Sequence, residues 1–228
     1  MFLDKYYIIL VLPTVIISLI CQAKVSSAFK KYSKVGSSRG LTGAEAAKAI
    51  LKRNGLFDVT VERVSGMLSD HYDPRKKCIR LSDAVYSGAS VASVGVAAHE
   101  TGHAIQHSEQ YAWLGLRSAI MPVAGIGSSL GPYMAIFGLM FRWDILIIAG
   151  ILLFSGAVVF YIVTLPVEFD ASSRALEALE SNGMLSPNEI AGSRKVLQAA
   201  AMTYVASALT AVASLTRLIL LSRNRRRD

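Results

Sequence analysis

Four long stretches without a charged residue constrain the fold of this chain more than any other feature. They are the stretches Tyr6–Ala23, Ser118–Phe141, Ile145–Val167 and Val196–Thr216. A helix needs about 20 mostly apolar residues to cross a bilayer, so each stretch is long enough to do so. Because a chain of 228 residues has too few polar residues to cover four such helices in water, the sequence predicts an integral membrane protein rather than a soluble enzyme with buried core helices.

The first and last stretches each allow more than one interpretation. We interpret the first as an uncleaved anchor, because only Lys5 precedes it as a basic residue and no small-x-small cleavage site occurs near Cys21. The last stretch either spans the membrane and packs a polar stripe against other helices, or lies along the inner membrane surface. The stripe is formed by Thr203, Ser207, Thr210, Ser214 and Arg217.

The basic residues predict the orientation in the membrane. Five of them follow the first stretch, namely Lys24, Lys30, Lys31, Lys34 and Arg39. By the positive-inside rule they place residues 24–115 in the cytoplasm, with the N-terminus outside. The tail Arg223–Arg227 conflicts with this rule if the last stretch is a full span. The net charge of +8 suits anionic lipid better than nucleic acid, because the basic residues flank apolar segments.

These patterns divide the chain into five parts. We expect an anchor over 1–23, a cytoplasmic part over 24–115, a transmembrane hairpin over 116–166 turning at 142–144, a helix and loop over 167–195, and an apolar helix with a basic tail over 196–228. The fold class predicted is a mainly α integral membrane protein with a small β-sheet and three to four transmembrane helices. The two cysteines, Cys21 and Cys78, are expected to be free thiols.

Local patterns predict the elements of the polar part. A capping box at Thr42–Glu45 opens a helix through about Arg53, and 58–64 alternates like a strand. Two arms, 66–69 and 77–82, flank a turn at 70–75 and predict a hairpin. A helix is expected from 87–90 to about Gln106. Another is expected to open at Glu168 and end at 182–183, followed by a second capping box at 186–189.

The motif His99-Glu100-Thr101-Gly102-His103 lies on the helix expected to end near Gln106. Histidines four residues apart share one face of a helix, so both imidazoles can reach one Zn²⁺, and Glu100 lies beside them to act as a base on a zinc-bound water. Two of the four histidines of the chain fall in this motif. The pattern predicts a zinc hydrolase site, although a chance match on an ordinary helix gives the same letters.

A catalytic zinc needs a third protein ligand. His107 lies a further turn along the same helix, where three ligands on three consecutive turns cannot converge, so we expect it to cap the helix or face lipid headgroups. His71 is either a ligand or, as we favour, a surface histidine. Glu168 is the better candidate, because a carboxylate is favoured at a helix N-terminus and Ala171 allows close approach. Asp170 and Glu177 are rivals, and Asp170 also suits the role of orienting a histidine.

Taken together, the motif His99–His103, the segments Leu68–Pro74 and Leu81-Ser82, and the segment Pro166–Ser172 resemble the YugP-type family of bacterial membrane zinc peptidases. More distantly the chain resembles the HtpX and CAAX-prenyl membrane peptidases. These resemblances imply zincin-like (gluzincin) helices, with His99, His103 and Glu168 as ligands of one zinc ion per chain and Glu100 as base. One departure is that the distant relatives have Asp four residues after the ligand Glu, where this chain has Ser172.

The expected function is a zinc-dependent endopeptidase acting at the cytoplasmic face of a bacterial plasma membrane, on peptides or membrane proteins. Quality control of membrane proteins is the role we expect for it. The hairpin beside the motif helix either binds the extended substrate along an edge strand or simply covers the helix. The oxyanion donor stays open between His71, Tyr72 and Arg174. A non-hydrolytic zinc-binding scaffold or sensor is the alternative. A transporter ranks last, because it should have a charged residue inside a span, and apart from Arg217 in the last apolar segment none occurs.

Overall fold

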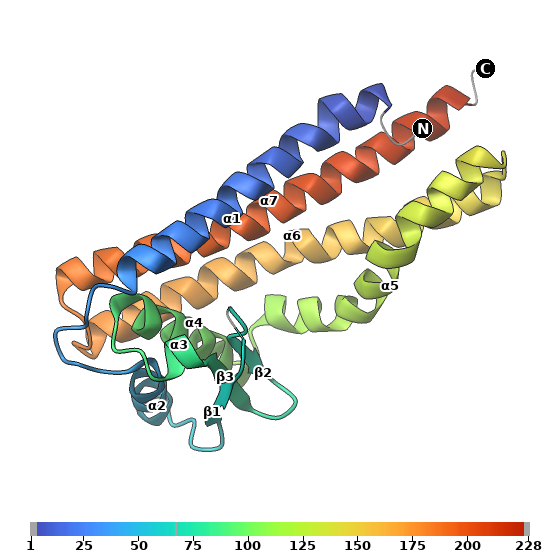
Figure 1. Cartoon of the computed structure of the whole chain (residues 1–228). Coiled ribbons are helices and arrows are strands. Elements are labelled where there is room, and N and C mark those ends of the chain that lie inside the picture. Colours follow the sequence, from blue (N-terminus) through green and yellow to red (C-terminus); the bar gives the residue numbers. More distant parts are fainter. Residues whose placement is uncertain (1–3, 67, 226–228) are drawn as a thin grey trace. The chain divides into compact units, whose positions relative to one another are not determined.

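A computed structural model describes residues 4–66 and 68–225 of the chain. The described residues are mainly helical and include one three-stranded sheet (Figure 1). They divide into two compact units, each described here by itself. The site-bearing unit comprises Ala23–Leu114 and Pro166–Ala201, and the apolar unit comprises residues 4–22, 115–165 and 202–225.

Short elements fill most of the site-bearing unit. In chain order they are α2 (Gly43–Arg53), β1 (Thr60–Val64), β2 (His71–Asp73), β3 (Cys78–Ser82), α3 (Asp83–Tyr86) and α4 (Val91–Ser108). The helix α2 begins with the predicted capping box, since Glu45 N–H donates to Thr42 Oγ1 and Thr42 N–H donates back to Glu45 Oε2. Ser90 caps α4 by accepting a hydrogen bond from Ser93 N–H.

The sheet has the strand order β1-β3-β2, with β1 parallel and β2 antiparallel to β3. The predicted hairpin exists, but its first arm is β2 (His71–Asp73) and not residues 66–69. The turn lies later than expected because Asp73 Oδ1 accepts hydrogen bonds from the N–H groups of Arg75 and Lys76. Asp70, which we expected in the turn, accepts instead from the backbone and hydroxyl of Ser82.

The described residues also form four long helices. The first, α1 (Leu12–Tyr32), follows a π-helical turn at Tyr7–Val11. The other three are α5 (Ala112–Met140), α6 (Asp144–Ser181) and α7 (Pro187–Arg225). The turn between α5 and α6 lies where the sequence predicts it. The helix predicted to open at Glu168 does not exist as a separate element, because α6 continues through Pro166. Proline removes one backbone donor, yet packed neighbours allow a helix to continue past it.

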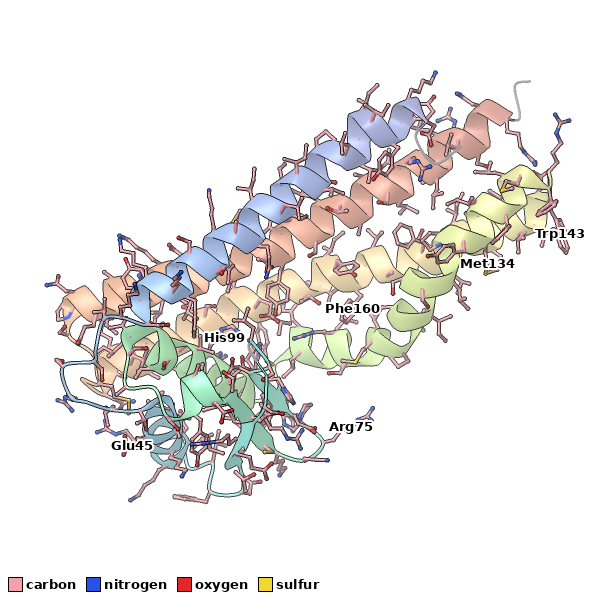
Figure 2. All side chains as sticks on the ribbon, viewed as in Figure 1. Glu45, Arg75, His99, Met134, Trp143 and Phe160 are labelled. Carbon is pink, nitrogen blue, oxygen red and sulfur yellow. The ribbon has the colours of Figure 1, made fainter. Side chains whose placement is uncertain are left out.

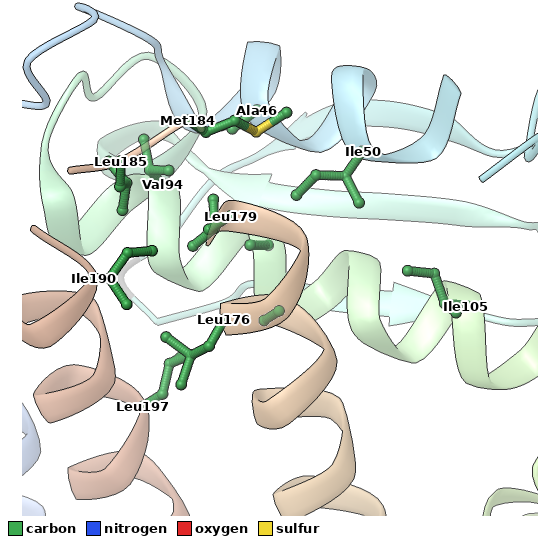
Figure 3. Close-up of a cluster of buried hydrophobic side chains, with 12 residues drawn as sticks. Ala46, Ile50, Val94, Ile105, Leu176, Leu179, Met184, Leu185, Ile190 and Leu197 are labelled. Atoms are coloured by element: carbon green, nitrogen blue, oxygen red, sulfur yellow. The ribbon is translucent and has the colours of Figure 1, made fainter. Parts of the chain in front are cut away.

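A buried apolar cluster joins the helices of the site-bearing unit (Figure 3). It combines Ile50 of α2, Val94 and Ile105 of α4, and Leu179 of α6 with residues that precede and begin α7. Val94 and Leu179 have an exposed fraction of 0 %. The cluster therefore fixes α4 against the C-terminal part of α6, the two segments that carry the motif and Glu168.

In the apolar unit, α5 and α6 are packed backbone to backbone. A Cβ atom added at Gly150 would lie 2.5 Å from Ala135 N and 2.6 Å from Gly131 O, so only glycine permits this approach. Figure 1 shows a bend in α5, which contains Pro122 and Pro132. Small residues at such contacts are typical of helices that associate in lipid.

Part of the polar stripe of α7 lies toward α1 in the same unit. Thr210 Oγ1 lies 3.3 Å from Ser18 Oγ of α1, and Ser207 and Ser214 line the same cavity as Ser18. Near the other end of the stripe, Arg217 forms an ion pair with Asp4 at 2.6 Å. Among the described residues, four helices are long and apolar enough to cross a membrane. They are the helix over Tyr7–Tyr32 and the helices α5, α6 and α7.

Candidate metal centre

The two motif histidines lie one turn apart on α4, on the face toward α6. Their ring centroids are 4.8 Å apart and the ring planes are 81° to one another. Figure 2 labels His99 on α4. The backbone of α6 comes close because residue 102 is a glycine, where an added Cβ would lie 2.5 Å from Ala171 O. The Gly102 of the motif and the small Ala171 together allow the approach that the sequence suggested.

That approach brings Glu168 to the histidines. Its Oε2 atom lies 3.4 Å from His99 Nε2 and 3.7 Å from His103 Nε2. The ligand atoms of these three residues all lie within 4.8 Å of one another. The side chain of Glu168 has an exposed fraction of 3 %, against 15 % for His99 and 12 % for His103. Within the part of the chain that the structure describes, no other such group of histidine, cysteine and carboxylate side chains occurs.

These distances fit a tetrahedral zinc ion. Zinc bonds nitrogen and oxygen at about 2.0–2.1 Å, which separates neighbouring ligand atoms by roughly 3.3 Å. The two histidine-to-glutamate distances are close to that value without any movement. Three ligands also leave the fourth position for water, as catalytic zinc sites require.

The electrostatics of the site also favour a cation. Burial lowers the pKa of His103, but its close contact with Glu168 and the nearby charges of Glu100 and Glu168 raise that pKa above the ordinary histidine value. Glu100 is itself largely buried, with an exposed fraction of 8 %. The carboxylates therefore draw positive charge to the place where the ligand atoms converge.

The Nδ1 atoms of both histidines have partners on the side away from Glu168. His99 Nδ1 lies 3.1 Å from Ser172 Oγ, and His103 Nδ1 lies 3.0 Å from Gln106 Oε1. Ser172 thus lies where an orienting residue should, although the sequence presented it as a departure from the distant relatives. Sequence reasoning missed Gln106 in this place, and its spacing of three residues from His103 was the available clue.

The other candidate residues are not in the ligand group. Asp170 does not contact a histidine and instead accepts hydrogen bonds from Gln106 and Arg174. The Nδ1 atom of His107 lies 2.8 Å from the hydroxyl of Tyr72 on β2, a contact that the sequence did not predict. His71 is exposed, with Nδ1 2.7 Å from Ser69 O, as expected for a surface histidine.

The three oxyanion candidates differ in their surroundings. Arg174 is bound to the carboxylates of Asp170 and Glu109, each at 2.6 Å. Burial, together with the charges of Asp58 and Asp73, raises the pKa of Tyr72 to about 12. The hydroxyl of Tyr72 therefore keeps its proton and remains a hydrogen-bond donor across the neutral range.

The fold and the site define a helical protein with four apolar helices long enough to span a membrane and a His-Glu-x-x-His helix facing a buried glutamate. The chain belongs to the family described as "Putative neutral zinc metallopeptidase", which matches residues 7–223. It is similar to the "Putative membrane protease YugP" of Bacillus subtilis (strain 168), with 48 % identity over 220 residues, 96 % of this chain and 98 % of that protein. No solved structure matches the chain. The family resemblance expected from the sequence is therefore confirmed.

Proposed function

We propose that this chain is a membrane-embedded zinc endopeptidase that hydrolyses peptide bonds in membrane proteins or in segments next to a span. One observation carries the proposal, the convergence of His99, His103 and Glu168 beside the buried Glu100. The family supports the metal and the reaction class, and the four apolar helices support the membrane location. We also propose that the site faces the cytoplasm, since basic residues crowd the C-terminal end of α1.

Each residue has a defined task in the proposed reaction. His99, His103 and Glu168 would hold the zinc ion, which supplies Lewis acidity toward the scissile carbonyl and acidifies water. Glu100 accepts a proton from the attacking water as the new C–O bond forms. It then returns that proton to the amine nitrogen as the C–N bond breaks, so the carboxylate is regenerated.

The extended substrate would pair with β2. This strand lies at an edge of the sheet, and Tyr72 connects it to α4 through His107. Exposed edge strands bind extended peptides by main-chain hydrogen bonds. The strand thus offers a support for a peptide beside the helix that carries His99 and His103.

The first test is the zinc content of the detergent-purified full chain, wild type beside Glu168→Ala. We expect about one zinc per wild-type chain, as a three-ligand site holds one ion, and a strong loss in the variant. Glu177→Gln is the matched control, because Glu177 is an exposed carboxylate on the same helix. Equal zinc contents in wild type and Glu168→Ala would mean that another residue supplies the third ligand.

The second test separates hydrolysis from metal binding. Replacing Glu100 with Gln should abolish cleavage of β-casein, an unfolded protein probe, while the zinc content stays at the wild-type level. A wild-type chain that binds zinc but cleaves neither β-casein nor a reconstituted membrane protein would favour a zinc-binding scaffold or sensor. Cleavage that persists in Glu100→Gln would contradict the proposed role of this carboxylate.

A further inference from the structure

Gln106 is a buried residue whose side-chain amide has hydrogen-bond partners at both its oxygen and its nitrogen. Its exposed fraction is 0 %, and it lies one turn after His103 on α4. Its Oε1 atom is 3.0 Å from His103 Nδ1. Its Nε2 atom donates to Val167 O at 2.8 Å and to Asp170 Oδ2 at 2.7 Å. Since a buried amide without partners costs free energy, this full set of partners stabilises its position.

The partners determine which way the amide points. The carbonyl of Val167 can only accept a hydrogen bond, and the ionised carboxylate of Asp170 also only accepts. The NH₂ group of Gln106 must therefore face them, which leaves Oε1 toward His103. Because Oε1 can only accept, His103 must carry a proton on Nδ1, and in the neutral imidazole the lone pair is then on Nε2, the nitrogen that lies 3.7 Å from Glu168.

An ion pair with Arg174 holds Asp170 in place. Arg174 Nε donates to Asp170 Oδ2 at 2.6 Å, one turn along α6, and the same guanidinium donates to Glu109 at 2.6 Å. A carboxylate paired with arginine stays ionised and remains an acceptor. Asp170 thus accepts from both Gln106 and Arg174, while Arg174 also donates to Glu109.

The same amide connects the two ligand-bearing helices. Val167 directly precedes Glu168, and Asp170 follows it by two residues. Gln106 therefore binds α6 on both sides of Glu168 while it binds His103 on α4. Both the protonation of His103 and its spacing to Glu168 depend on one side chain.

We propose that Gln106 is a positioning residue, which fixes His103 in the Nδ1–H form and holds it at ligand distance from Glu168 before a metal binds. This inference rests on the proposed function, because it takes His99, His103 and Glu168 as the ligands of a zinc ion. His99 lacks an equivalent device, because a hydroxyl such as that of Ser172 can donate or accept and does not dictate the position of the histidine proton. Gln106 therefore matters more for metal affinity than Ser172 does.

The test compares Gln106→Met with Gln198→Met in the full chain in detergent. Gln198 is an exposed glutamine on α7 and serves as the matched control. Zinc affinity is measured by competition with a chromophoric chelator. We expect Gln106→Met to lower the affinity 10- to 100-fold, the usual effect of removing a partner that orients a ligand. Ser172→Ala should lower it less, and Gln198→Met should leave it unchanged.

A second measurement does not depend on metal. Nitrogen-15 spectra of the metal-free protein, recorded at alkaline pH where imidazoles are neutral, report which ring nitrogen of each of the four histidines is protonated. His103 should show the Nδ1–H form in wild type and a mixture in Gln106→Met. Gln106→Leu also lacks both the oxygen and the NH₂ group of the amide, so it carries the same test if the methionine variant does not fold.

Two results would overturn the inference. One is that Gln106→Met binds zinc as tightly as wild type and that its His103 still carries the proton on Nδ1. The other is an Nε2–H form of His103 in the metal-free wild type. A wild-type chain that binds no zinc but shows the Nδ1–H form of His103 would contradict the proposed function and leave the role of Gln106 in fixing that proton standing.

Discussion

The two parts of α6 show how one helix serves two different surroundings. In the first part, large apolar side chains are exposed, with Ile145 at 75 % and Leu152 at 67 %. In the second part, Val167, Ala171 and Leu179 each have an exposed fraction of 0 %. A long row of exposed apolar side chains is stable in lipid, whereas protein neighbours cover the second part.

The comparison shows which part of α6 depends on specific packing partners. The part of α6 before Pro166 has the composition of a span and needs only length and apolarity on its outer face. The part after Pro166 has a defined partner at each turn, because Ala171 contacts Gly102 and Leu179 lies in the cluster of Figure 3. Substitutions of the same kind should therefore have very different effects in the two parts.

The largest difference is expected between Leu179→Ala and Leu152→Ala. Both change leucine to alanine on α6, at 0 % and 67 % exposure. Removing a buried leucine side chain should destabilise the protein by about 2–5 kcal/mol, while the exposed position should change stability by less than about 0.5 kcal/mol. Thermal unfolding in detergent measures both. Equal shifts in Tm would mean that the two parts of α6 do not differ in packing.

A second contrast concerns the close approach at residue 102. In Gly102→Ala the new Cβ would lie 2.5 Å from Ala171 O, so α6 must move away from α4. We expect a loss of about 1–3 kcal/mol, the usual cost of overpacking, together with weaker zinc binding. Gly115→Ala is the control, since nothing lies within 4 Å of its added Cβ. Zinc binding that stays at the wild-type level in Gly102→Ala would show that the site tolerates the displacement.

A smaller effect is expected at the start of α7. Glu189 accepts hydrogen bonds from the backbone and hydroxyl of Ser38 and from the backbone of Ser186. Glu189→Gln removes the charge and one accepting oxygen, which should cost about 1–2 kcal/mol. Glu180→Gln, at an exposed position of α6, should cost almost nothing. Chemical denaturation compares the two, and equal midpoints would mean that this contact adds no stability to the site-bearing unit.

The smallest effect is expected for Tyr72→Phe, which removes the hydrogen bond to His107 at a cost of about 1 kcal/mol. Its pH dependence has a defined sign. The pKa of Tyr72 is raised from 10.0 to about 12, so the folded chain holds this proton more tightly than the unfolded chain. The stabilisation is complete below about pH 10 and decreases as the pH rises toward 12. Unfolding of wild type and variant across that range measures it, and a constant difference would contradict the shift.

The sequence predicted the features that depend on neighbours along the chain. The capping box at Thr42, the helix that carries His99, and the closeness of Ala171 to that helix are all confirmed. The contacts of Gln106 with α6 could not be predicted, because Val167 and Asp170 lie more than 60 residues later in the chain. The continuity of α6 through Pro166 was also missed, since a helix-breaking rule for proline holds in water and fails among packed apolar helices.

The unbroken course of α6 has a consequence for the lipids around the protein. The uncharged run Ile145–Val167 is about 34 Å long at roughly 1.5 Å per residue, slightly more than a typical hydrocarbon thickness of about 30 Å. Glu168 follows that run directly in the same helix. If the run spans the bilayer, membrane thickness and helix tilt would set the depth of Glu168, the proposed third metal ligand. Lipid composition would then act on the chemistry of the site without any ligand binding to it.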